Sequence, residues 1–147
     1  MIAVVQRVSS ANVRVKENIV GEIDEGLVIL LGIEKGDDEK DSRSLAQKIS
    51  RLRMFNDVND KMNLSIQDVN GAALVVSQFT LCADTKNGRR PSFINAESPD
   101  SSNYLYELFK ISLIENDIKV ESGEFGSMMD VQLVNNGPVT FIMDSHT

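Results

Sequence analysis

The stretch Gly26-Leu27-Val28-Ile29-Leu30-Leu31-Gly32-Ile33 decides how the chain folds. It is a continuous apolar run of the length of one β-strand, and it is far shorter than the ~20 residues that a membrane-spanning helix needs. Because neighbouring side chains of a strand point to opposite faces, an unbroken apolar run indicates a strand that is buried on both faces. We therefore expect residues 26–33 to form the centre of a sheet, with other elements covering each side.

The segments around this run carry strand patterns. Residues 2–8 are rich in β-branched side chains, and Ala11, Val13 and Val15 alternate with polar residues, which indicates a second, half-buried strand. Further strands are expected at residues 18–23, 72–81, 119–124, 129–134 and 139–143. Residues 56–63 and 84–96 are expected to be loops.

Two amphipathic helices are expected. The first follows the N-cap candidates Asp37 and Asp38, and its apolar face consists of Leu45, Ala46, Ile49 and Leu52. The second follows Ser98-Pro99, a cap residue and a first-turn proline, and its apolar residues are Tyr104, Leu105, Leu108, Phe109 and Leu113. Together these patterns predict a single α+β domain over residues 1–147, with a curved, barrel-like, mainly antiparallel sheet and two main helices.

The composition excludes several kinds of chemistry. The chain has 147 residues with one Cys and one His, so Cys82 cannot form an internal disulfide and a four-ligand zinc site is not expected. The single His146 is next to last, where chains usually fray, so a catalytic imidazole is not expected. We therefore expect no metal and no organic cofactor.

The charge of the chain is uneven. The net charge is −7, and residues 1–90 carry 13 basic and 13 acidic residues, so the whole excess lies in residues 91–147. An acidic total argues against bulk binding of nucleic acid, but Lys86, Arg89 and Arg90 form a local basic cluster. With no membrane-length segment and no secretory leader at the N-terminus, the chain is expected to be cytoplasmic.

Ser77-Gln78-Phe79-Thr80-Leu81 places polar side chains at the end of a buried strand. Such groups must find hydrogen-bond partners or line a pocket. A hydroxyl near free backbone N–H groups suits an ester carbonyl, because the N–H groups can hold the developing oxyanion. The alternative is that Ser77 and Thr80 are strand hydroxyls bonded to neighbouring backbone.

Three other groups of residues have similar alternatives. Asn135-Asn136-Gly137-Pro138-Val139-Thr140 is either a special turn or an ordinary hairpin turn. Arg89-Arg90-Pro91-Ser92-Phe93 could bind phosphate through arginine and stack Phe93 on a base, or it is a solvated loop with a buried Phe anchor. Arg7, among apolar neighbours, needs a carboxylate, a set of carbonyls or a ligand as its partner.

The two motifs at 77–81 and 135–140, in this order, resemble the paired signature of the D-aminoacyl-tRNA deacylases. The resemblance extends over the whole chain through Met1–Val8, Gly26–Ile33, Leu52–Phe55, Lys61–Asn63, Arg89–Phe93 and Phe125-Gly126. One departure is Asn136, where the family frequently has Asp, and little effect is expected from it. Phe79 resembles the residue of the chirally strict branch of the family.

The resemblance implies a homodimeric hydrolase of carboxylic esters. Its substrates would be D-aminoacyl-tRNA and mischarged glycyl-tRNA, cleaved at the ester to the 3′-terminal adenosine. Gly137-Pro138 would correspond to the cis pair that one subunit inserts into the other's pocket, where it rejects L side chains. Asn135, Val139 and Thr140 would support that turn, and Arg7 would brace it through its carbonyls.

The resemblance also implies roles for the first motif. The backbone N–H groups of Phe79 and Thr80 would form an oxyanion hole, and Ser77 and Gln78 would shape the pocket. Two family mechanisms differ over Thr80, which is the nucleophile in one, whereas in the other the tRNA 2′-OH activates the attack. Since a threonine nucleophile needs a base and the only His lies at the tail, the second is favoured. Lys86, Arg89, Arg90 and Phe93 are the expected tRNA contacts, and the alternative function is a noncatalytic tRNA-binding module.

Overall fold

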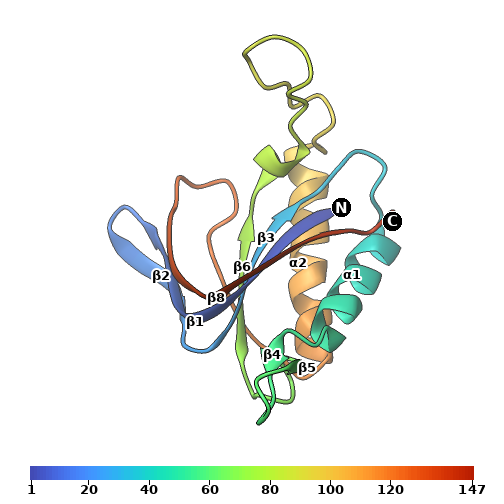
Figure 1. Cartoon of the computed structure of the whole chain (residues 1–147). Coiled ribbons are helices and arrows are strands. Elements are labelled where there is room, and N and C mark those ends of the chain that lie inside the picture. Colours follow the sequence, from blue (N-terminus) through green and yellow to red (C-terminus); the bar gives the residue numbers. More distant parts are fainter.

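The apolar run forms the central strand β3 (Gly26–Gly32) of the computed structural model, which describes residues 1–147 (Figure 1). Six of its seven residues are buried. Leu27, Ile29 and Leu31 belong to the larger core, which includes residues of both long helices, whereas Val28 belongs to a second core on the opposite face. The prediction of a strand covered on both faces is confirmed.

Six strands form one strongly curved sheet. Its other members are β1 (Ile2–Val15), β2 (Asn18–Ile23), β6 (Ala72–Ser77), β7 (Lys119–Ser122) and β8 (Asp130–Asp144). The order is β2-β1-β3-β6-β7, and β8 pairs with β1. The strands at the two ends of this order, β2 and β7, lie close together, as shown by the 2.6 Å that would separate a Cβ on Gly21 from the carbonyl oxygen of Ser122. The sheet is therefore nearly closed and barrel-like.

The sheet is mixed, which corrects the expectation of a mainly antiparallel one. Strand β1 pairs antiparallel with β2, β3 and β8, whereas β6 pairs parallel with both β3 and β7. Each parallel pair is joined through one of the two predicted helices. Parallel neighbours need such a long crossover, so the position of the helices along the chain explains the mixed pairing.

The two helices are α1 (Glu39–Arg51) and α2 (Pro99–Glu115). Helix α1 begins with a capping box in which Asp38 accepts from the Asp41 N–H and Asp41 accepts from the Asp38 N–H. Helix α2 begins with the predicted proline, but the Ser98 side chain makes no cap hydrogen bond. Neither helix has both the length and the apolar character needed to cross a bilayer.

Several predicted boundaries were wrong. The two strands expected before residue 16 are one continuous strand, β1, and the strand expected over 72–81 ends at Ser77 and is followed by a short 3₁₀ helix, η1 (Phe79–Cys82). The 56–63 loop contains part of a small hairpin of β4 (Phe55–Asn56) and β5 (Met62–Leu64). The strands expected at 129–134 and 139–143 are one strand, β8.

The two ends of the chain lie side by side (Figure 1). The Met1 ammonium lies 2.8 Å from Asp37 Oδ1 and 3.4 Å from Glu34 Oε2, and the Ser145 N–H donates to the Met1 carbonyl. His146 Nε2 lies 2.7 Å from the same Asp37 oxygen. The expectation of a frayed tail was therefore wrong, because the C-terminal residues are bonded to the start of the chain and to the β3–α1 loop.

Candidate active site

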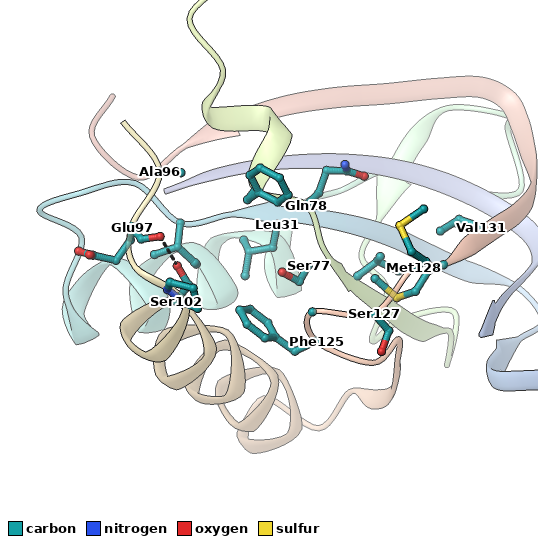
Figure 2. Close-up of a pocket in the computed structure, with 16 residues that line it drawn as sticks. Leu31, Ser77, Gln78, Ala96, Glu97, Ser102, Phe125, Ser127, Met128 and Val131 are labelled. Atoms are coloured by element: carbon teal, nitrogen blue, oxygen red, sulfur yellow. Dashed lines mark hydrogen bonds between the residues drawn. The ribbon is translucent and has the colours of Figure 1, made fainter. Parts of the chain in front are cut away.

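A cavity of about 510 Å³ lies beside the end of β6 (Figure 2). Its walls come from the ends of β3 and β6, the start of α2 and the connection from β7 to β8. The residues that line it include Ser77, Gln78, Phe79, Ala96, Glu97, Ser102, Phe125, Met128 and Met129. Most of the wall is apolar, and a few polar groups face the interior, which is the usual character of a small-molecule site.

Three residues of the first motif line this cavity. Ser77 is the last residue of β6, and the Gln78 N–H donates to the Leu31 carbonyl at 2.8 Å. Gly32 allows the following turn to come close, because a Cβ there would lie 3.1 Å from the Gln78 carbonyl oxygen. The parallel pairing with β3 thus places the motif at the mouth of the cavity.

The backbone at Phe79 and Thr80 provides donors. These are the first two residues of η1, and its first N–H with a carbonyl partner in the turn is that of Leu81, which donates to Gln78. The opening residues of a helix have no acceptor within it for their N–H groups. Phe79 lines the cavity and Thr80 follows it, so two adjacent N–H groups without an acceptor in the turn lie on the residues beside the cavity, and an oxyanion hole is built from donors of this kind.

Neither hydroxyl of this motif is bonded to backbone, so the alternative interpretation of Ser77 and Thr80 was wrong. The half-buried Ser77 hydroxyl makes no hydrogen bond within the chain and lies on the cavity wall (Figure 2). Thr80 is exposed, and its Oγ1 accepts from Gln78 Nε2 at 2.5 Å. No base contacts the Thr80 hydroxyl.

Cys82 and His146, the only cysteine and the only histidine of the chain, do not line the cavity. Cys82 is buried, its Sγ donates to the Ile33 carbonyl, and burial raises its thiol pKa to about 11. A thiol with this pKa stays protonated near neutral pH and is a poor nucleophile. The pKa of His146 is raised, chiefly by its hydrogen bond to Asp37, and this residue lies at the joined chain ends.

The 84–96 loop is anchored at both ends, and it projects beyond the end of β6 (Figure 1). Asp84 and Ser92 exchange backbone hydrogen bonds at 2.8 and 2.9 Å. Phe93 packs its ring edge-on against Phe79, with the centroids 5.0 Å apart. Lys86, Arg89 and Arg90 are exposed, so the loop joins the predicted basic cluster to the predicted oxyanion residue.

The second motif is not a hairpin turn. Asn135 pairs with Val8 and Thr140 pairs with Gln6 of the same strand, so the chain continues in one direction. Residues 136–139 form a bulge opposite a single residue of β1, Arg7. The Asn135 side chain spans the base of this bulge, because it donates to Thr140 Oγ1 at 3.0 Å and accepts from the Val139 N–H at 3.2 Å.

At the tip of the bulge, the Gly137–Pro138 peptide is cis and both residues are exposed. Arg7 holds the bulge from below. It is 7% exposed, its Nε donates to the Asn136 carbonyl at 3.1 Å, and its Nη1 donates to the Met54 carbonyl at 2.8 Å and to Asn56 Oδ1 at 3.1 Å. The sequence predicted a carboxylate, a set of carbonyls or a ligand as the partner of Arg7. In the structure this buried cation is bonded to carbonyl oxygens and to no carboxylate.

The structure thus separates the two predicted motifs within one chain. Ser77, Gln78 and Phe79 line the cavity, whereas Gly137 and Pro138 do not. No motif predicted the other lining residues Phe125, Met128, Met129 and Glu97. Only the Phe125-Gly126 pair was indicated beforehand, through the family resemblance. The other residues lie in irregular connections, which have no hydrophobic periodicity from which their positions could be predicted.

Comparison with known proteins agrees with the fold and the motifs. Residues 4–144 match the family described as D-Tyr-tRNA(Tyr) deacylase. The chain is 54% identical to the D-aminoacyl-tRNA deacylase of Bacillus pumilus, with 99% of each chain covered. It is 51% identical to that of Thermosipho africanus, with 99% of this chain and 97% of the relative covered.

Solved structures show the same fold. The structure titled c-Myc DNA Unwinding Element Binding Protein has a TM-score of 0.91 and 34% identity over 98% of each chain. A probable eukaryotic D-amino acid tRNA deacylase has a TM-score of 0.83 at 15% identity, and 97% of each chain is covered, which shows likeness of fold alone. Matched over nearly its whole length in sequence, this chain belongs to the D-Tyr-tRNA(Tyr) deacylase family.

Proposed function

We propose that the protein is a D-aminoacyl-tRNA deacylase, a hydrolase that acts on the ester between a D-amino acid and the 3′-terminal adenosine of tRNA. Water adds to the ester carbonyl carbon, the bond to the ribose oxygen breaks, and that oxygen takes up a proton. The observation that carries the proposal is the cavity at the end of β6, which Phe79 lines, together with the backbone N–H groups of Phe79 and Thr80, which have no acceptor in η1. These donors would stabilise the negative charge of the tetrahedral intermediate.

The cavity is suited to the adenosine end of the substrate. Its volume of about 510 Å³ lies in the usual range for small-molecule sites. Phe125 contributes an aromatic ring to the wall (Figure 2), and an unstacked base can pack on such a ring. Met128 and Met129 supply further apolar, adaptable surface.

We propose that rejection of L-aminoacyl-tRNA needs a homodimer. The Gly137–Pro138 tip is exposed and braced by Arg7, and it does not line the cavity of its own chain. In a dimer the tip of one protomer would enter the cavity of the other, where its carbonyls would bind the substrate α-amino group. An L side chain would then have no room, whereas glycine, with no side chain, would be accepted from glycyl-tRNA.

We propose that the 2′-OH of the terminal adenosine, rather than Thr80, assists the attack. The Thr80 hydroxyl is exposed and bonds only to the Gln78 amide, which is not a base. Thr80→Ala is therefore expected to retain activity within about tenfold of the wild type, since removal of a functioning nucleophile costs far more. A tRNA ending in 2′-deoxyadenosine should lose much more, and an inactive but folded Thr80→Ala protein would contradict this mechanism.

The activity is tested with tRNA charged with D-Tyr or L-Tyr. Purified protein should release D-Tyr, leave L-Tyr attached and also deacylate glycyl-tRNA. Equal release of D-Tyr and L-Tyr, or release of neither, would contradict the proposal. A noncatalytic tRNA-binding module, which the exposed Lys86, Arg89 and Arg90 favour, would instead bind tRNA with no turnover of the ester.

A further inference from the structure

A second concave surface lies at the end of α1, away from the cavity. Its lining consists of Ser44, Gln47, Lys48, Arg51, Leu52 and Arg53. Three of these six residues are cations and none is a carboxylate, although the chain as a whole carries a net charge of −7. We call this surface the α1 groove.

The cations of the α1 groove form no salt bridge, although the pKa of Asp68, which is lowered chiefly by hydrogen bonds from Ser65, is also lowered by the charge of Arg53. Lys48, Arg51 and Arg53 are exposed, and the only side-chain bond among them joins Arg53 Nη1 to Asn63 Oδ1 at 3.3 Å. In contrast, Arg43 on the same helix lies 3.6 Å from Glu115. Lys48 and Arg51 also lie in the last turn of α1, where cations offset the negative end of the helix dipole, but Arg53 lies beyond the helix.

The α1 groove is connected to the exposed tip of the bulge through two bonds. Arg53 is followed by Met54, whose carbonyl accepts from Arg7 Nη1. The Nε of the same guanidinium donates to the Asn136 carbonyl, next to Gly137. The groove therefore flanks the tip, whereas the chain's own cavity lies beside the end of β6.

We propose that the α1 groove of one protomer binds backbone phosphates of the tRNA whose 3′ end lies in the cavity of the partner. The proposal rests on the proposed function, in which the tip of one protomer enters the cavity of the partner. The α1 groove adjoins the tip, so it would then lie beside the entrance of the partner's cavity. Exposed cations that form no salt bridge suit phosphate. A tRNA is an elongated polyanion, so it can place its 3′ end in the cavity and backbone phosphates on the groove together.

The first test replaces the three cations by alanine in one variant, K48A/R51A/R53A. Its dissociation constant for tRNA should rise about tenfold or more, and the slope of log Kd against log salt should fall by about 3 if all three cations contact phosphate, because each lost contact removes roughly one unit. Hydrolysis of D-tyrosyl-adenosine, which has no phosphate, should stay at the wild-type rate. The measurement of tRNA affinity does not depend on catalysis. A protein without deacylase activity would therefore contradict the proposed function but would leave the test of phosphate binding by the groove intact.

The matched control removes three exposed cations that lie outside both the α1 groove and the 84–96 loop, as K40A/R43A/K119A. It changes the net charge by the same amount but removes no cation of the groove, so it should leave the salt slope within error of the wild type. The proposal is overturned if the control weakens tRNA binding as much as the groove variant does. It is also overturned if the groove variant keeps the wild-type Kd and salt slope.

A mixed dimer tests which cavity the groove serves. One protomer carries Ala96→Trp, which blocks its cavity, and the other carries K48A/R51A/R53A. If the groove acts across the dimer, the open cavity uses the intact groove of its partner, and the KM for D-Tyr-tRNA returns to the wild-type value. A KM as high as that of the groove-variant homodimer would assign the contact to the same protomer and overturn the proposal.

Discussion

Gly137 has a backbone conformation that other residues rarely adopt. Its φ is +128°, and an added Cβ would lie 2.8 Å from Val139 Cγ2 and 2.9 Å from Arg7 Nη2. Gly137→Ala is therefore expected to lower the free energy of unfolding by about 1–3 kcal/mol and to displace the tip, with at least a tenfold loss of D-Tyr-tRNA hydrolysis. Denaturant unfolding and the deacylation assay measure the two effects.

The neighbouring Asn136 is the control for this prediction. Its side chain is exposed and makes no hydrogen bond, and Arg7 bonds only to its backbone carbonyl. Asn136→Asp should therefore behave as the wild type in both measurements. If Gly137→Ala were equally silent, neither the conformation of this residue nor its contact with Arg7 would matter for the site.

The 84–96 loop is the element that connects the cavity to the basic cluster. Phe93 packs against Phe79, and Phe79 is still 57% exposed. Phe93→Ala should free the Phe79 backbone and lower kcat several-fold, because an aromatic pair contributes about 0.5–1.5 kcal/mol beyond its buried area. Phe93→Tyr should restore kcat, and equal kcat values for all three proteins would show that Phe93 does not position Phe79.

The tip of the same loop carries a separate prediction about affinity. Lys86, Arg89 and Arg90 are exposed and form no ion pair with the chain, so the arginines are free to contact phosphate. The double variant R89A/R90A should weaken tRNA binding about tenfold at low salt, with a smaller effect at high salt, because the contact is electrostatic. Titrations at two salt concentrations measure this, and unchanged binding would place the contact elsewhere.

At the scale of the whole molecule, the joined chain ends predict a pH dependence of stability. The hydrogen bond to Asp37 raises the pKa of His146, so the folded state favours the protonated ring. This contribution is fully present below the pKa of unfolded histidine, about 6.5, and is lost as pH rises through the folded pKa. His146→Ala should therefore lower Tm more at pH 5.5 than at pH 9.

His146→Gln is the control for this effect, because glutamine keeps a neutral donor for Asp37. Its Tm should fall below that of the wild type at pH 5.5 and approach it at pH 9. A Tm difference that is the same at both pH values would show that the charge of His146 does not stabilise the joined ends. Deacylase activity should be unchanged in both variants, since His146 does not line the cavity.

Periodic features were predicted well from the sequence, and pairing was not. The burial of β3 on both faces, the Asp38 cap of α1 and the proline at the start of α2 all appear in the structure. The strand predicted over 72–81 ends at Ser77, because the chain turns into η1 (Phe79–Cys82) beside the cavity. The mixed sheet was missed because strand direction depends on the crossover through each helix, which a local pattern does not report.

The sequence by itself determined which segments are buried, where both helices begin and which short motifs carry polar groups, since these follow from side-chain spacing and cap chemistry within a few residues. Only the tertiary structure decided that 136–139 is a bulge opposite Arg7, that Phe93 packs on Phe79, and that Phe125 and Ser77 line the same cavity. Each of these joins residues far apart in the chain. Such contacts are set by strand pairing and packing, and the local sequence around either partner contains no record of the other.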